Sequence, residues 1–151
     1  MPKETFSHTA LTRAARTEVW KALDRPETWE GIGGVDKVIA PVIDNDDRLR
    51  GFSFETAVGG KIYLGKATPK AREESRLMAW NIENSEVRGV TTVQLSDDGP
   101  GTRVQVTLEV ESVGMFASMF FPVIANAIGS GLPQTVDAFA AGFDPGPRAS
   151  T

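Results

Sequence analysis

The chain has 151 residues, a length at which one domain buries its own core. Hydrophobic residues make up 40% and charged residues 24%, with a net charge of −4, which fits a soluble globular protein and offers no basic surface for nucleic acid. The absence of cysteine excludes disulfides, thiolate metal sites and a cysteine nucleophile. Since His8 is the single histidine, a three-histidine metal site is excluded, and we expect neither metal nor cofactor.

The chain begins with a strand pattern and two short helices. Residues 5–12 alternate in character, which places Phe6, His8 and Ala10 on one face of a strand. Val19 and Leu23 then stand at helical spacing, with Thr17 as the expected N-cap. A second short turn follows, opened by a proline and ending at residue 29.

The middle of the chain reads as consecutive strands joined by short turns. Turns are indicated at Asp44–Asp47, at Gly59-Gly60 and at residues 97–101. The strands between them are expected at residues 35–43, 52–58, 61–68, 76–83, 89–95 and 102–110. Consecutive strands with short turns pair antiparallel and form one curved sheet.

The C-terminal part changes to a helical pattern almost without charge. Its apolar stripe repeats every three or four residues and comprises Phe120, Ile124, Ile128, Leu132, Val136, Phe139 and Phe143. Such a helix must be largely enclosed by the sheet, and residues 129–133 (Gly-Ser-Gly-Leu-Pro) should bend or break it. The twenty uncharged residues 113–132 are read as a buried helix and not a membrane span, because they contain Pro122 and Asn126 and lack basic flanks.

These elements predict an α+β fold. About seven antiparallel strands form a curved sheet around a long C-terminal helix, with two short helices between strands one and two. Residues 1–143 form one domain, and residues 144–151 (DPGPRAST) a disordered tail. With no apolar segment at the N-terminus, we expect a cytoplasmic protein without stable membrane insertion.

The chain resembles a known superfamily over about residues 4–143. The matching segments are 14–20 (AARTEVW), 23–29 (LDRPETW), 88–89 (RG), 101–104 (GTRV) and 136–139 (VDAF). They are similar to the START, polyketide-cyclase and birch-pollen-allergen proteins, whose fold is called the helix-grip. Among these, the bacterial polyketide-cyclase-like proteins and those similar to the G component of carbon monoxide dehydrogenase look most similar.

The resemblance implies a cavity between sheet and C-terminal helix that takes an apolar ligand. The expected function is therefore binding of a hydrophobic or amphipathic, lipid- or polyketide-like small molecule by a monomer or homodimer. The alternative is a cyclase, aromatase or dehydratase acting on a polyketide-like substrate, and the fold serves binders and enzymes alike. A third reading places the apolar helix on a lipid surface, which the negative net charge does not favour for anionic lipids.

Two groups of residues are candidates for the site. His8 and Tyr63 are the candidate catalytic residues: histidine is the side chain type suited to proton transfer near neutral pH, and the small neighbours Gly65 and Ala67 are expected to leave room beside Tyr63. Structural roles for both stay open. The expected cavity wall consists of Phe52, Phe54, Tyr63, Met78, Trp80, Phe116, Met119, Phe120 and Ile124. These side chains could instead fill the interior.

Overall fold

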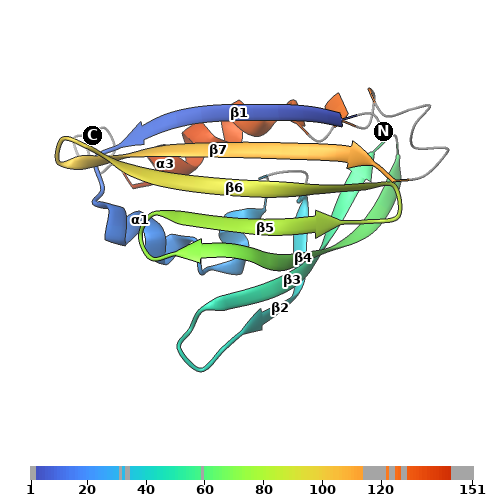
Figure 1. Cartoon of the computed structure of the whole chain (residues 1–151), viewed down its shortest axis with the longest axis horizontal. Helices are drawn as coiled ribbons and strands as arrows, with labels where there is room; N and C mark the ends of the chain where they lie inside the picture. The colour runs from blue at the N-terminus through green and yellow to red at the C-terminus, as the bar shows by residue number, and fades with distance from the viewer. Residues whose placement is uncertain are drawn as a thin grey trace, which may run out of the picture.

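The computed structural model describes residues 3–30, 32, 35–58, 60–113, 122, 125–126 and 129–143. A seven-stranded antiparallel sheet in the order β1-β7-β6-β5-β4-β3-β2 carries the helices on one face (Figure 1). The strands are β1 (Lys3–Thr12), β2 (Lys37–Ile43), β3 (Leu49–Val58), β4 (Lys61–Glu73), β5 (Leu77–Glu83), β6 (Val87–Asp98) and β7 (Gly101–Ser112). The helices are α1 (Arg16–Ala22), the 3-10 helix η1 (Pro26–Trp29) and α3 (Leu132–Ala141). The predicted α+β architecture is confirmed.

The inward face of the sheet is set by strict alternation along the strands. In β7, Val104, Val106 and Leu108 are at most 1% exposed, whereas the intervening Arg103 and Gln105 are exposed. Successive side chains of a strand point to opposite faces, so this pattern buries one face under the helices and leaves the other in solvent.

Two local predictions near the ends of elements are wrong. Thr17 is not the N-cap of α1, because Ala15 occupies that position and no side chain caps it. The fourth strand does not end near Pro69 but continues to Glu73. It continues because β4 pairs only with β5 beyond Ala67 and inserts one extra residue after Pro69, a bulge that accommodates a residue without an N–H.

The C-terminal helix α3 packs along the edge strand β1. It begins at Leu132 after a turn at residues 130–131, which confirms the predicted interruption, and Pro133 lies in its first turn, where a missing N–H is tolerated. Leu132 and Val136 of the predicted stripe are buried, and Gly129 lies against the ring of Phe6. No helix in the described part of the chain has the length and apolar character needed to cross a bilayer.

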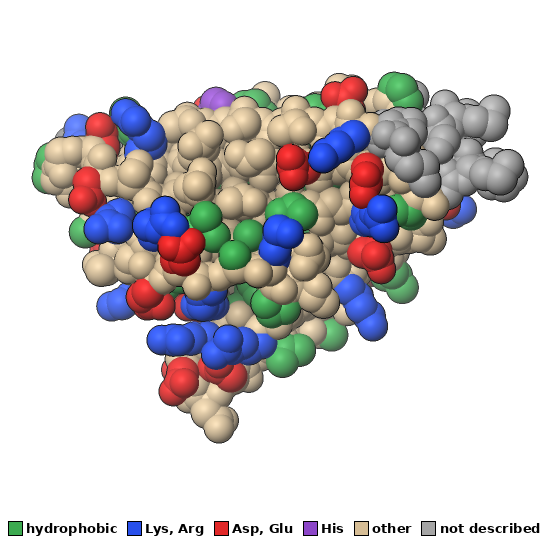
Figure 2. Space-filling view, in the orientation of Figure 1, with side chains coloured by type: hydrophobic (Ala, Val, Ile, Leu, Met, Phe, Trp, Pro, Cys, Tyr) green, Lys and Arg blue, Asp and Glu red, His purple; other side chains and the backbone are tan. Residues whose placement is uncertain are grey.

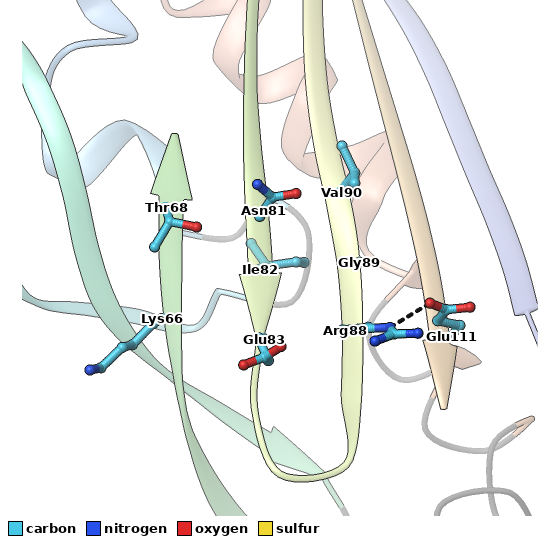
Figure 3. Close-up of a pocket in the computed structure, with 9 residues that line it drawn as sticks. All are labelled: Lys66, Thr68, Asn81, Ile82, Glu83, Arg88, Gly89, Val90 and Glu111. Carbon is cyan, nitrogen blue, oxygen red and sulfur yellow. Dashed lines mark hydrogen bonds and ion pairs between the residues drawn. The ribbon is translucent and has the colours of Figure 1, made fainter. Parts of the chain in front are cut away.

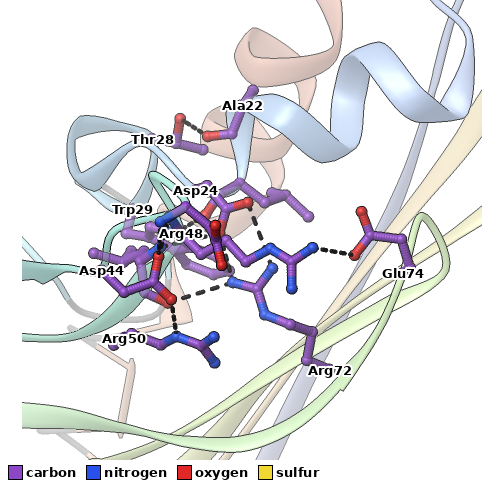
Figure 4. A network of polar contacts seen from close by, with 12 residues as sticks. Ala22, Asp24, Thr28, Trp29, Asp44, Arg48, Arg50, Arg72 and Glu74 are labelled. Carbon is purple, nitrogen blue, oxygen red and sulfur yellow. Dashed lines mark hydrogen bonds and ion pairs between the residues drawn. The ribbon is translucent and has the colours of Figure 1, made fainter.

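An ion pair joins the end of α1 to β4 (Figure 4). Arg72 Nη2 donates to Asp24 Oδ1 at 2.5 Å and Nη1 to Oδ2 at 3.4 Å, and both side chains are less than 20% exposed. The same two groups serve the backbone of β3, since Leu49 N–H donates to Asp24 Oδ1 and Arg72 Nη2 donates to Leu49 O. We call Asp24, Arg72 and Leu49 the clamp. It ties α1, β3 and β4 together by charge-assisted hydrogen bonds.

Removing one partner of the clamp should destabilise the fold. Replacing Arg72 with Ala leaves the carboxylate of Asp24 largely buried without its cation, so the free energy of unfolding should fall by about 2–4 kcal/mol in urea titrations. The matched control is Arg88→Ala, which breaks an ion pair whose arginine is 57% exposed. Solvent screens that pair, and a loss as large as that of the Arg72 variant would contradict the special role of the clamp.

Candidate functional site

An aromatic cluster lies on the inward face of β3 and β5. Phe52, Met78 and Trp80 are each less than 5% exposed. The ring of Trp80 meets Phe52 at 5.5 Å and Trp29 of η1 at 6.0 Å between centroids, both edge to face. Phe54 joins through Phe52 at 6.2 Å. Four of the predicted wall residues therefore come together, and in this part of the interior they fill space by contacting one another.

Trp80 carries a buried donor without an acceptor. Its side chain is 2% exposed and its indole Nε1 has no hydrogen-bond partner. The neighbouring Trp29 is buried equally deeply, yet its Nε1 donates to Leu23 O at 2.8 Å. A buried N–H without an acceptor costs about 1–3 kcal/mol, so the Trp80 N–H marks a place where an oxygen atom would bind favourably.

Tyr63 lies at the same inward face of β4, half-buried beside Thr56 of β3. The prediction that Gly65 leaves room beside it is wrong: a Cβ at Gly65 would lie 2.6 Å from the ring of Phe54, which occupies that space. The ammonium of Lys61 sits 5.2 Å from the centre of the Tyr63 ring, a cation–π contact.

His8 faces inward from β1 but is engaged by the C-terminal helix. Its Nε2 lies 2.8 Å from Oδ1 of Asp137 in α3, with the two side chains 28% and 61% exposed. The pair joins the helix to the edge strand. His8 stands on β1 and Tyr63 on β4, and β7, β6 and β5 lie between them. The order of the strands therefore does not place the two side chains next to each other. Phe116, Met119, Phe120 and Ile124 lie outside the described residues.

A small pocket lies at the side of β4. It has a volume of about 170 Å³, and its lining residues include Arg50, Lys70 and Arg72 together with the buried Met78 and Trp80. It combines a basic rim with an apolar floor. Pockets that hold a whole drug-sized ligand measure roughly 300–1,000 Å³, so this one has room for one end of such a molecule. The basic rim is not predicted from the sequence, although Pro69 within a strand pattern is a signal for a bulge there.

A larger depression of about 410 Å³ lies on the outer face of the sheet (Figure 3). The charged residues that line it form a row of alternating charge across the strands: Lys66, Glu83, Arg88 and Glu111 stand in register on β4, β5, β6 and β7. Arg88 Nε donates to Glu111 at 2.6 Å, and this bond is the main cause that lowers the pKa of Glu111. Positive and negative side chains alternate within the row and compensate each other, so the depression does not favour a ligand of either charge.

In the described part of the chain, no three His, Asp or Glu side chains lie close enough together to hold a metal ion. Comparison with protein-family models and with curated proteins finds no match.

Solved structures do match, at low sequence identity. A START superfamily protein from Mycobacterium smegmatis is 15% identical with a TM-score of 0.59, covering 86% of this chain and 97% of its own. The ZhuI aromatase/cyclase from Streptomyces sp. R1128 is 15% identical with a TM-score of 0.66, covering 93% and 94%. The protein Ara h 8.0201 is 13% identical with a TM-score of 0.52, covering 89% and 98%. The chain thus has the helix-grip fold of the START and polyketide-cyclase superfamily that its sequence resembles.

The contact between Gly65 and Phe54 can be tested by adding one methyl group. Gly65→Ala places a Cβ 2.6 Å from the Phe54 ring and 2.9 Å from Glu83 O, so the packed cluster must shift and the free energy of unfolding should fall by about 1–3 kcal/mol. Gly131→Ala is the control, because nothing lies within 4 Å of its Cβ. Equal thermal stability of the Gly65 variant and the wild type would show that the ring leaves room there after all.

Proposed function

We propose that this protein binds a hydrophobic or amphipathic small molecule against the inward face of the sheet, beneath the C-terminal helix. The observation that carries the proposal is the N–H of Trp80, which is buried among apolar side chains without an acceptor. A ligand that brings an oxygen atom to this N–H satisfies it, while its apolar part gains about 25 cal/mol per Å² of buried surface before ordering costs. The fold shared with a START superfamily protein supports the same function.

The aromatic cluster is suited to such a ligand because it can rearrange. Trp80 and Phe52 meet Trp29 and Phe54 edge to face, and Met78 beside them has a flexible, polarisable side chain. A guest can be accepted by rotation of these side chains without movement of the sheet. The ligand we propose is therefore lipid- or polyketide-like, with an apolar body and at least one oxygen acceptor.

Two measurements test binding. Native mass spectrometry of the freshly purified protein should reveal an adduct that extracts into organic solvent, and 1-decanol should bind in calorimetric titrations. Trp80→Phe should weaken 1-decanol binding about two- to tenfold, the range of one net hydrogen bond. Trp29→Phe is the control, because the N–H that it removes already donates to Leu23 O and is not available to a ligand. Its affinity for 1-decanol should therefore equal that of the wild type, even if its stability is lower. A protein without adduct that also fails to bind 1-decanol would contradict the proposal.

A second candidate function is cyclisation of a polyketide-like substrate, favoured by the likeness to an aromatase/cyclase at a TM-score of 0.66. His8 would then move a proton and Tyr63 would orient a carbonyl group. His8→Ala and Tyr63→Phe should each reduce turnover at least a hundredfold, measured by chromatography of the products. Asp137→Asn is a second variant to measure, since it removes the negative charge that His8 contacts and leaves the imidazole in place. Unchanged turnover in both the His8 and Tyr63 variants would eliminate the enzymatic function as described.

A further inference from the structure

Strands β3 and β4 separate before either of them ends. Their ladder stops at the pair Phe52–Ala67, although β3 extends back to Leu49 and β4 runs on to Glu73. Figure 1 shows the β2–β3 hairpin diverging from β4 and β5 beyond this point. The clamp bonds the backbone of Leu49 across the separation. The 170 Å³ pocket lies in the resulting gap, which we call the β3–β4 gap.

Each side of the gap carries a β-bulge, and each bulge presents a cation. Between Val42–Gly51 and Ile43–Leu49 the register of β3 against β2 skips one residue, which is Arg50. Between Pro69–Trp80 and Ala71–Ala79 the register of β4 against β5 likewise skips Lys70. A bulge re-aims the side chain of its extra residue, and bulges occur frequently beside functional sites.

The charges at the gap leave one positive charge uncompensated. Asp44 accepts a hydrogen bond from Arg50 Nε at 2.5 Å, and Arg72 is paired with Asp24. The pKa of Asp44 is lowered to about 2, first by the backbone N–H of Arg48 and then by Arg50, so its carboxylate stays ionised at neutral pH. Among the described residues, no carboxylate lies within 4.0 Å of the Lys70 ammonium. Basic side chains gather with acidic ones at this end of the molecule (Figure 2).

The floor of the gap is apolar. Met78 and Trp80 are 1% and 2% exposed, and both line the pocket. A molecule held here therefore meets cations at the rim and apolar residues below them.

We infer that the β3–β4 gap binds the carboxylate end of an amphipathic monoacid, with Lys70 and the Nη groups of Arg50 holding the carboxylate and the apolar chain lying on Met78 and Trp80. A carboxylate carries one negative charge and matches the single uncompensated cation, whereas a phosphate monoester carries about 1.5 to 2. The inference rests on the proposed function, since the apolar chain must reach the interior. It adds the class of ligand and the side from which the ligand binds.

The test compares two probes of equal chain length, decanoate and 1-decanol, by titration calorimetry at pH 7 and low ionic strength. The wild type should bind decanoate at least tenfold more tightly than 1-decanol, a difference of about 1.4 kcal/mol, and added salt should reduce this ratio. Lys70→Glu should remove the preference, so that decanoate binds no more tightly than 1-decanol. Lys3→Glu is the matched control, because it changes the net charge equally on β1, across the sheet from the gap, and it should keep the preference.

The outcomes separate this inference from the proposed function. If the wild type binds both probes with equal affinity, or if Lys70→Glu leaves the preference for decanoate intact, the carboxylate site is wrong while apolar binding stands. If Lys70→Glu weakens both probes equally in a protein that retains its melting temperature, Lys70 acts on the interior in general and the site as described is also wrong. If neither probe binds the wild type, the proposed function itself fails.

Discussion

The clamp of Asp24, Arg72 and Leu49 is the constraint on which the open side of this sheet depends. Where β3 and β4 stop pairing, the Leu49 N–H and C=O lose their ladder partners, and an unpaired buried backbone group costs as much as a lost hydrogen bond. Asp24 and Arg72 replace both partners and neutralise each other as they do so. The strands can therefore separate here without leaving the Leu49 N–H and C=O unsatisfied, and the same bonds fix the end of α1 to the sheet.

The interior behind this opening combines two opposed properties. Its rings meet in the edge-to-face geometry of a packed core, which favours a filled interior. Two tryptophans in contact nevertheless differ in their hydrogen bonding: the Trp29 N–H donates to a carbonyl oxygen, and the Trp80 N–H has no acceptor. Phenylalanine at position 80 would keep a ring there and remove the donor that lacks an acceptor. In the proposed function, the bound ligand supplies the oxygen atom for this N–H.

The sequence predicts the strands, the inward face and the aromatic cluster, because alternation is local: Phe52, Phe54, Met78 and Trp80 stand on the inward face as their patterns indicate. It does not predict the clamp, since Asp24 and Arg72 are 48 residues apart in polar stretches without periodicity. Nor does it predict the gap, which depends on where two registers skip a residue. The error at Gly65 has the same origin, because only the pairing of β3 with β4 brings the Phe54 ring onto it.

The positions of helix and gap bear on how a ligand could exchange. On the β1 side, contacts among the described residues hold α3 against the sheet: Gly129 lies against the Phe6 ring, His8 bonds Asp137, and Leu132 and Val136 are buried. The β3–β4 gap lies across the sheet from these contacts. In the proposed binding mode, a ligand that uses the gap leaves these contacts in place. The clamp crosses the gap, however, and Arg72 lines the pocket, so the ligand must pass beside Arg72 or displace it. Moving α3 would instead expose buried apolar surface, at about 25 cal/mol per Å².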